Sequence, residues 1–579
     1  MNHSLEFPRP KFVRQDWDLL NGTWSFAFDD ENIGLNQHWF AGAKLKQEIT
    51  VPYTYETKKS GIDDQRFHPV VWYERNISIP DENKDKTILL HFQASDYHTT
   101  VWVNGCCAGS HEGGYTSFSF DLTPFLVDDS SQTITVRVED SMSTDQPRGK
   151  QRWINKNFGC WYVQTTGIWQ SVWLEYVNKH HFEKVDIQPD LDQASVAFTY
   201  QLAGEIQGVE VETVITFNDY EVRRFSFKPE HHETHMKVAL TSSIHEWGVA
   251  VWSLEQPNLY DVTFIIRKDG EIVDQATSYF GLRKISIKNG QVLLNNRPVY
   301  QKLILDQGYW EDTHLTPPSL EALETDIDAT KALGFNGIRK HQKIEDERFY
   351  ALCDQKGLLV WAEMPSAYSF STKAVKAFSK EWFDVVDQLA HYPSIVTWVP
   401  FNESWGVGQI FTNEQQQAFT ESIYYGTKSL DSRPVIVNDG WEHTISDIIT
   451  LHDYEEFADR FLRRYEDETA ILGNVYPHNL DKYAFAEGYE YKGQPVMISE
   501  YGGIAFTTDD GWGYGNQVKS EKDFLMRYEG MTDAIKALPY VSGFCYTQLT
   551  DVQQEVNGLL DENRKPKIKE EKINALNDK

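Results

Sequence analysis

The chain has 579 residues, which exceeds the size of one hydrophobic core and predicts three or four domains. Hydrophobic residues make up 40% and charged residues 24%, a composition typical of a folded globular protein and not of a disordered one. Fifty-five basic and 86 acidic side chains leave a formal net charge of −31, which disfavours nucleic acid and anionic membranes as partners. A neutral partner is the expectation.

The N-terminal residues lack the apolar core of a signal peptide, and the chain contains no run of about 18 apolar residues. We therefore expect a cytoplasmic protein without a membrane span. The five cysteines are odd in number and lack metal-ligand spacing, so reduced structural thiols are expected and no metal site. Aromatic residues reach 14%, which suits stacking on sugars and suits the packing of β-sheets equally well.

Residues 1–180 alternate apolar and polar side chains in short runs separated by Asn, Gly, Asp and Pro, as in TTVWVNG (99–105) and TITVRVE (133–139). This period of two predicts an antiparallel, jelly-roll-like β-sandwich. Residues 181–286 continue the alternation, in VEVETVITF and LYDVTFIIRKDGEIV among others, over a length that suits a seven-stranded sandwich of immunoglobulin type.

From residue 287 to 579, short apolar runs alternate with helical segments. The stretch 317–334 begins with Pro317, Pro318 and Ser319 and ends at Gly334, which are helix start and stop signals. Eight strand candidates span about 280 residues and predict a (β/α)₈ barrel. They are VYQKLIL (299–305), NGIR (336–339), LLVW (358–361), IVTWVPF (395–401), PVIV (434–437), DIITL (447–451), PVMIS (495–499) and SGFCYT (542–547).

The ends of these strands are polar or aromatic, and the barrel geometry gathers them at one mouth. Two strands that are otherwise apolar close on a glutamate: Glu403 after the fourth strand and Glu500 after the seventh. Two carboxylates facing each other across a barrel mouth are what glycoside cleavage requires. A single glutamate here would more often pair with an arginine or cap a helix, but two at these ends, with Asn402 beside one, favour catalysis.

The chain resembles glycoside hydrolase family 2, the family of β-galactosidases, β-glucuronidases and β-mannosidases. HYPSIVTWVPFNESWG (391–406) is similar to the acid/base signature of that family, and SEYGG (499–503) is similar to its nucleophile strand. LNGTW (20–24) and VWVNG (101–105) resemble its N-terminal sugar-binding sandwich. The resemblance covers essentially the whole chain and implies the same order of sandwich, immunoglobulin-like domain and barrel.

The resemblance implies that Glu403 is the general acid/base, that Glu500 is the nucleophile and that Asn402 contacts the 2-hydroxyl of the sugar, with retention of anomeric configuration. Retention requires the two carboxyl groups to be about 5–5.5 Å apart. We expect Glu403 to be protonated at rest through burial beside the negative Glu500, and Glu500 to stay ionised through hydrogen bonds. This mechanism needs no cofactor and no metal. Galactosidases of the family sometimes hold ions near the site, so the resemblance leaves a bound cation open.

The stretch GIRKHQK departs from a second signature of the family, in which an Arg precedes a Ser-His-Tyr-Pro element. The His is displaced by one position and the Tyr-Pro is absent, so the family role does not carry over directly to His341. We favour a contact to a sugar or a carboxylate over a core histidine satisfied by its neighbours. Arg339 is expected either to hold Glu500 ionised or to neutralise Glu363.

Further candidates for substrate contact stand at other strand ends. The resemblance favours Tyr454 as a partner of the nucleophile, and Tyr546 occupies the place where relatives often show a Trp platform. The remaining candidates, for each of which simple packing is the alternative, are Asp306, Trp310, Trp405 and His452.

The predicted substrate rests on one difference between this sequence and the glucuronidases of the family. Family members acting on glucuronides carry an Asn-x-Lys element after the eighth strand, whereas this chain has Glu555-Val556-Asn557 with no Lys. Asp551 and Glu555 would repel a uronate. The sequence therefore predicts a retaining, exo-acting β-galactosidase that acts on small oligosaccharides or glycosides. The alternatives are a β-glucuronidase, a β-mannosidase, an arabinopyranosidase and a non-catalytic carbohydrate-binding protein.

The insertion 455–494 is expected to shape the pocket rim or to form an assembly surface. The second possibility leaves a homo-oligomer open.

Overall fold

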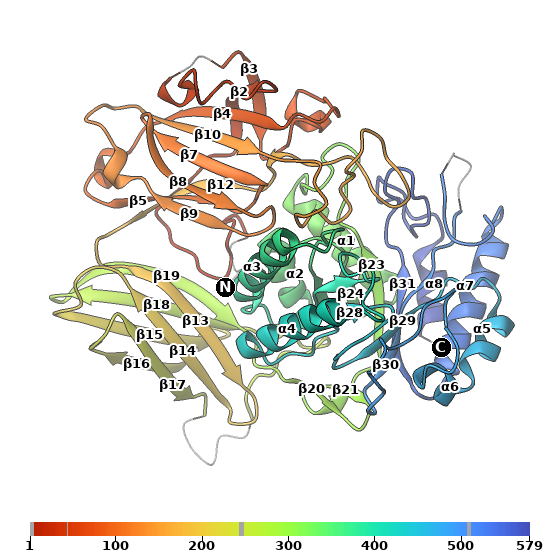
Figure 1. The fold of residues 1–579 in the computed structure, drawn as a ribbon. Helices are drawn as coiled ribbons and strands as arrows, with labels where there is room; N and C mark the ends of the chain where they lie inside the picture. Colours follow the sequence, from red (N-terminus) through yellow and green to blue (C-terminus); the bar gives the residue numbers. More distant parts are fainter. Residues whose placement is uncertain (1–4, 43–44, 242–247, 507–510, 579) are drawn as a thin grey trace.

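The computed structural model describes residues 5–42, 45–241, 248–506 and 511–578. The chain forms two β-sandwiches that lie on the same side of a barrel of strands and helices (Figure 1). This is the predicted three-part architecture. Within the described residues, no helix is both long and apolar enough to span a membrane.

The first sandwich contains a four-stranded sheet in the order β1-β12-β5-β9, a six-stranded sheet in the order β3-β2-β4-β10-β7-β8, and the short pair β11-β6. Its strands are β1 (Trp17–Leu19), β2 (Gly22–Phe28), β3 (Gln47–Val51), β4 (Val70–Ile77), β5 (Thr87–Phe92), β6 (Ser95–Asp96), β7 (His98–Val103), β8 (Cys106–Glu112), β9 (Phe118–Asp121), β10 (Gln132–Glu139), β11 (Gly167–Ile168) and β12 (Val172–Val177). A long connection, residues 140–166, separates β10 from β11 and leaves the sandwich toward the barrel.

The second sandwich packs a three-stranded sheet, β13-β14-β17, on a four-stranded sheet, β16-β15-β18-β19. Along β14 the buried Val196, Phe198, Tyr200 and Leu202 alternate with more exposed residues, which is the period of two expected of a strand with one buried face. Its strands are β13 (Phe182–Asp190), β14 (Ser195–Leu202), β15 (Val209–Phe217), β16 (Tyr220–Phe227), β17 (Glu233–Ala239), β18 (Tyr260–Lys268) and β19 (Glu271–Phe280). Phe12, from the N-terminal segment, also packs in this core.

A small sheet of β20 (Ile285–Lys288), β21 (Gln291–Leu294) and β22 (Arg297–Pro298) precedes the barrel. Parallel strands then form one curled sheet in the order β26-β25-β24-β23-β31-β30-β29. The barrel strands are β23 (Gln301–Asp306), β24 (Gly337–Lys340), β25 (Leu359–Glu363), β26 (Ile395–Val399), β27 (Phe401–Asn402), β28 (Asn438–Asp439), β29 (Ile449–His452), β30 (Val496–Gly502) and β31 (Val541–Thr547).

The predicted fifth strand, 434–437, differs from its neighbours because it does not form a continuous ladder. Pro434 has no N–H to donate, the amide of Val435 donates to the side chain of Asp447, and the amide of Val437 donates to Ser446 Oγ. This segment is joined to β26 by a bridge from Trp398 to Val435 and by the two-residue pair β27-β28. On the side of β29, the amide of Asp447 donates to the carbonyl of Val435 and the amide of His452 donates to the carbonyl of Gly440.

The helices of the barrel are α1 (Leu320–Ala332), α2 (Glu347–Lys356), α3 (Thr372–Leu389), α4 (Glu414–Leu430), α5 (Ala458–Tyr465), α6 (Glu468–Leu472), α7 (Glu521–Lys536) and α8 (Glu570–Asn577). The predicted helix at 317–334 corresponds to α1, where Ser319 caps the first turn by accepting from the amide of Ala322. Gly334 follows the last turn at φ +84°, a conformation that glycine adopts without strain.

Candidate active site

Glu403 lies on a tight turn at the carboxyl end of the fourth barrel strand. Its backbone has φ +51°, in the left-handed region, and the next residue, Ser404, has φ +59°. The turn is held by the amide of Glu403, which donates to the carbonyl of Asp439 at 2.9 Å, and by the amide of Ser404, which donates to Asn438 Oδ1 at 2.9 Å. A non-glycine residue in this conformation is costly and is typical of functional sites.

Glu500 faces Glu403 across the mouth of the barrel. An oxygen of Glu403, an oxygen of Glu500 and a ring nitrogen of His452 all lie within 4.8 Å of one another. This separation suits retention, because an inverting enzyme needs about 6.5–9.5 Å between its carboxyl groups to admit a water molecule. The side chain of Glu403 is 20% exposed and that of Glu500 is 6% exposed, so Glu403 is the more accessible of the two.

His452 lies between the two carboxylates. Its Nδ1 is 2.9 Å from Glu403 Oε1 and 3.4 Å from Glu500 Oε2, and its Nε2 is 2.9 Å from Asp439 Oδ2. Burial alone would lower the pKa of His452, but the charges of Glu500 and Asp439 outweigh burial and raise this pKa to about 10. His452 is therefore a buried imidazolium at neutral pH, and both of its ring N–H groups are donors.

Arg339, at the end of β24, lies beneath Glu500. Its Nη1 donates to Glu500 Oε1 at 2.8 Å and is 2.7 Å from Asp439 Oδ2, while its Nε donates to Glu363 Oε2 at 2.7 Å. Its Nη2 donates to Asn402 Oδ1 at 2.7 Å. The two roles considered from the sequence, holding Glu500 and neutralising Glu363, are thus both filled by one fully buried guanidinium.

These cations determine the ionisation of the buried acids. Burial raises the pKa of Glu500, but His452 and Arg339 more than compensate, and the net pKa lies below the ordinary value. Glu363 behaves in the same way, because Arg339 and His341 overcome burial and lower its pKa to about 2. Glu500 is therefore ionised at neutral pH, as a nucleophile must be.

Tyr454 donates its hydroxyl to the second oxygen of Glu500, Oε2, at 2.5 Å. The ring of Tyr514 stacks on the ring of Tyr454 with the two planes 4° apart and so fixes its orientation. Both oxygens of Glu500 therefore accept hydrogen bonds, one from Arg339 and the other from Tyr454.

Asn402, His341 and Trp405 also lie at this mouth. Asn402 uses Oδ1 to accept from Arg339, and within the described residues its amide nitrogen has no partner, so this nitrogen is free to donate to a sugar hydroxyl. His341 Nδ1 lies 3.0 Å from Glu363 Oε1, which is the carboxylate contact considered from the sequence. Trp405 is partly exposed, with its ring 6.2 Å from that of His341.

Two predicted contacts are corrected by the structure. Asp306 is fully buried, pairs with Lys340 Nζ at 2.5 Å and accepts from the amide of Gly308, so it supports the loop after β23 and does not face the two glutamates. Tyr546 is fully buried with its ring 4.9 Å from that of Tyr528 in α7. Side chains of successive strand residues point to opposite faces, and Tyr546 belongs to the face that packs on the helices.

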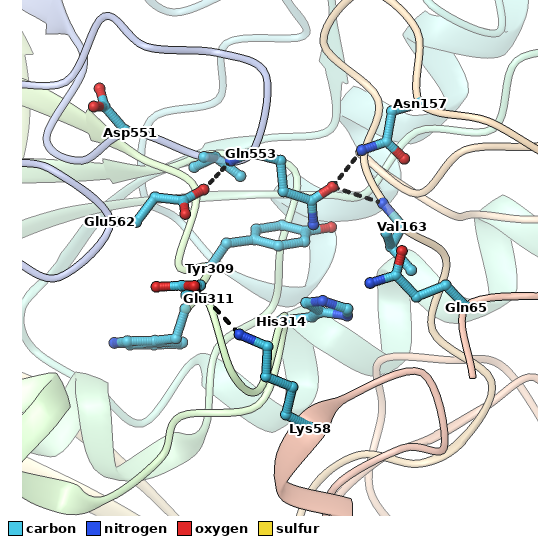
Figure 2. A pocket seen from close by; sticks show the side chains of 12 residues that line it. Lys58, Gln65, Asn157, Val163, Tyr309, Glu311, His314, Asp551, Gln553 and Glu562 are labelled. Carbon is cyan, nitrogen blue, oxygen red and sulfur yellow. Dashed lines mark hydrogen bonds and ion pairs between the residues drawn. The ribbon is translucent and has the colours of Figure 1, made fainter. Parts of the chain in front are cut away.

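Trp310 lies away from the carboxylates, at the seam between the first sandwich and the barrel. It lines a cavity of about 300 Å³ together with Tyr309, His314, Gln65, Asn157 and Gln553, among others (Figure 2). Asn157, from the sandwich, donates to Gln553 Oε1 at 2.6 Å across this seam. Neither Glu403 nor Glu500 lines this cavity, and we place the chemistry at the carboxylates.

Several residues of the site have no motif in the sequence that marks them. Asp439 was visible only as one polar residue at a strand end, yet it binds both Arg339 and His452. Tyr514 comes from a loop after β30, and Lys150 comes from the connection 140–166 of the first sandwich, which precedes every barrel strand. Pattern analysis of the barrel could not identify residues that a different domain contributes.

Glu403, His452 and Glu500 form the group of described residues with the spacing of a metal site. A histidine binds a metal through an unprotonated nitrogen, whereas both nitrogens of His452 are occupied by carboxylate partners and the ring is charged. These residues fit a protonated His452 that joins the carboxylates of Glu403 and Asp439 better than they fit a metal centre.

A barrel that ends in paired carboxylates, behind two β-sandwiches, defines a glycoside hydrolase. Three family models match the chain in sequence: the sugar binding domain of glycosyl hydrolases family 2 over residues 17–177, the glycosyl hydrolases family 2 domain over 180–283, and the TIM barrel domain of that family over 285–573. The chain belongs to glycosyl hydrolases family 2.

Its relatives have different names. A beta-galactosidase of Thermoanaerobacter pseudethanolicus is 25% identical over 566 residues, covering 92% of this chain and 71% of the relative. A beta-glucuronidase of Sus scrofa is 23% identical over 571 residues, covering 90% and 83%. The solved structure of a β-glucuronidase from Ruminococcus gnavus with uronic deoxynojirimycin superposes with a TM-score of 0.79 at 18% identity, covering 97% of this chain and 98% of that one.

Proposed function

We propose that this protein is a retaining, exo-acting β-glycosidase that hydrolyses terminal, non-reducing β-D-galactosides. Glu500 attacks the anomeric carbon and forms a glycosyl-enzyme, while Glu403 protonates the departing oxygen and then deprotonates the incoming water. The observation that carries this proposal is the pair of carboxylates within 4.8 Å, one of them held ionised by Arg339 and His452.

Contacts between the first sandwich and one side of the barrel mouth support the exo mode, in which the enzyme cleaves the terminal sugar of a chain. The hairpin 157–163 of the first sandwich lies against the barrel loop around Gln553 and Gln554, because Gln554 Nε2 donates to the carbonyls of Gly159 and Trp161 at 2.9 and 3.0 Å. Trp512 Nε1 donates to the carbonyl of Gly159 at 3.0 Å. A site closed on one side in this way suits the end of a chain and not its middle.

Preference for a neutral sugar over a uronate is supported by Glu555. Tyr162 donates its hydroxyl to this carboxylate, and the amide of Asn557 donates to it at 3.2 Å, but no described cation forms an ion pair with it. Asp551, the second acid considered from the sequence, pairs with Lys567 at 2.6 Å, so its charge is compensated. Lys150 lies close enough for its charge to act on Glu555, but a carboxylate without a direct ion pair near the mouth of the barrel still disfavours an anionic sugar.

A β-glucuronidase is the second candidate, because several curated relatives and the solved structure described above carry that name. A panel of nitrophenyl β-glycosides, including galactoside, glucoside, mannoside, glucuronide and the α-L-arabinopyranoside, distinguishes the two. The proposal expects the galactoside to have the highest kcat/KM. A glucuronide preferred by tenfold or more would contradict the choice of sugar.

The stereochemical part of the proposal is tested separately. Proton NMR of the first product formed from the best substrate should show the β-anomer before mutarotation, because two displacements at the anomeric carbon restore its configuration. Initial release of the α-anomer would contradict the retaining mechanism. Absence of turnover with retained sugar binding would favour a non-catalytic carbohydrate-binding protein.

A further inference from the structure

The first sandwich inserts one charged side chain into the mouth of the barrel. Lys150 lies in the connection 140–166, and its Nζ stands 4.9 Å from the centre of the Trp405 ring, two residues after Glu403. The lysine is only 5% exposed. A buried lysine normally has a carboxylate partner.

The backbone around Lys150 is fixed from both domains. The amides of Arg148 and Gly149 donate to the carbonyl of Ser366 at 3.0 and 3.1 Å, and Tyr368 donates its hydroxyl to the carbonyl of Gly149 at 2.6 Å. The amide of Tyr162 donates to the carbonyl of Lys150 at 2.8 Å. Lys150 is thus anchored on a rigid support, as a specificity residue requires.

Gly149 makes this close approach possible. It has φ +58°, and a Cβ atom at this position would lie 2.4 Å from the carbonyl oxygen of Gln342. The connection can therefore meet the loop after β24 only with glycine here. That loop also carries His341, so the lysine and His341 are brought to the same wall of the mouth.

Lys150 has weak partners within the protein. The thiol of Cys160 is its hydrogen-bond partner, and the carboxylates whose charges act on it are Glu555 and Glu500. Among the described residues, no carboxylate forms an ion pair with its ammonium. Burial would lower the pKa of Lys150, but Cys160, Glu555 and Glu500 together raise it, so the ammonium is charged. Since a thiol is a weak acceptor, most of the donor capacity of the ammonium is unused.

We propose that Lys150 is a specificity-determining residue of the glycosidase, whose ammonium donates hydrogen bonds to hydroxyl groups of a neutral glycon lying between Trp405 and the two glutamates. Lysine offers three rotatable donors, which suit the tetrahedral oxygens of adjacent hydroxyls. The aromatic face of Trp405 packs against the C–H groups of the same sugar. The negative charges of Glu555 and Glu500 already act on this ammonium, so a neutral polyol fits better than a further anion.

This inference rests on the proposed function, and its experiment separates the two. Lys150→Met keeps the length and the apolar stem of the side chain and removes the donors. We expect kcat/KM for the aryl β-galactoside to fall about 10- to 100-fold, which corresponds to a hydrogen bond to a charged group. Lys156→Met is the matched control, because Lys156 is exposed on the same connection, and it should leave kcat/KM unchanged.

A merely structural role is excluded with deoxy substrates. The loss caused by Lys150→Met should disappear for the 3-, 4- or 6-deoxygalactoside that lacks the bound hydroxyl and persist for the others. An equal loss for all three analogues, or no loss with the parent galactoside, would overturn the proposal. A loss confined to the glucuronide would also overturn it, because the ammonium would then bind a carboxylate.

The choice of galactose as the preferred sugar can be wrong while the proposed role of Lys150 holds. If the wild-type protein prefers another neutral β-glycoside, the deoxy series of that sugar is used, and the role of Lys150 is decided there by the same criterion. Should Lys150→Met lose its thermal transition, Lys150→Gln, which keeps a neutral donor, replaces it and is expected to show a smaller loss of the same pattern.

Discussion

Arg339 and Glu500 form a buried ion pair in which Nη1 of the arginine donates to Oε1 of the glutamate at 2.8 Å. The same guanidinium contacts Glu363 and Asp439, so one cation is shared by three buried carboxylates. Removing one partner from such a buried group costs far more than the group contributes, because uncompensated charges remain.

Replacing Arg339 by Met should therefore affect both stability and rate. We expect the free energy of unfolding to fall by about 3–5 kcal/mol and kcat to fall by about a hundredfold or more, since the acids beneath Glu500 lose their common partner. Thermal scans and nitrophenyl glycoside assays measure the two effects. Arg339→Lys retains the charge but not the fork of donors, and should lie between wild type and Arg339→Met. Wild-type values for both variants would contradict the role of Arg339.

Tyr454→Phe removes the donor to Glu500 Oε2 without changing the ring. We expect about a tenfold loss in kcat/KM and a shift of the acidic limb of the pH profile to higher pH, because the hydroxyl favours the ionised form of Glu500 and helps to lower its pKa. Tyr546→Phe is the matched control, because this hydroxyl lies on the helix-facing side of the barrel wall. If Tyr454→Phe and Tyr546→Phe show the same kcat/KM and the same pH profile, the hydrogen bond from Tyr454 to Glu500 does not contribute to catalysis.

The assignment of the two glutamates is tested by substitution and rescue. Glu403→Gln and Glu500→Gln should each lower kcat by several orders of magnitude. With azide, Glu403→Ala should produce a β-glycosyl azide and Glu500→Ala an α-glycosyl azide, because azide enters from the face that each missing carboxylate vacates. Product stereochemistry by NMR decides the matter, and the opposite pairing would exchange the two roles.

His452 should remain protonated well above neutral pH. Its pKa is raised to about 10, so the charged form persists through pH 8 and is lost as the pH rises through that value. Nitrogen NMR of histidine-labelled protein, with His452→Gln to assign the signal, measures this titration. An imidazole signal that titrates near 6.5, the ordinary value for histidine, would show that Glu500 and Asp439 do not hold the proton.

Removal of metal ions should leave the activity unchanged. The donor set of Glu403, His452 and Glu500 is occupied by a shared proton network, so dialysis against EDTA is expected to change neither kcat nor KM. Restoration of lost activity by Mg²⁺ or Zn²⁺ after dialysis would show that an ion belongs to the site.

The order of the three architectures could be predicted because each depends on a local period. Apolar and polar side chains that alternate with a period of two mark strands such as β14, and apolar runs that end in polar residues mark the barrel strands. The fifth strand was less predictable, since Asp447 and Ser446 take amide donors that a ladder would otherwise use. That competition involves residues nine and twelve positions away and leaves no trace in the run PVIV itself.

The site could be predicted in part for the same reason. Glu403, Glu500, Arg339 and Tyr454 stand at strand ends, where the barrel determines their position from the sequence alone. Asp306 and Tyr546 occupy similar ends yet point elsewhere, because one pairs with Lys340 and the other packs on α7. Whether the side chain at a strand end points toward the site depends on its packing and ion-pair partners, which the sequence pattern does not reveal.

The anchoring of Gly149 against the barrel loop has a consequence for engineering within the family. The proposed role of Lys150 places part of the sugar preference in the first sandwich, so transplanting the barrel of this chain behind another N-terminal sandwich would carry over the acids and Glu555 but not Lys150. Chimeras made at the junction near residue 180 would keep both glutamates and exchange only the contact that we propose for Lys150.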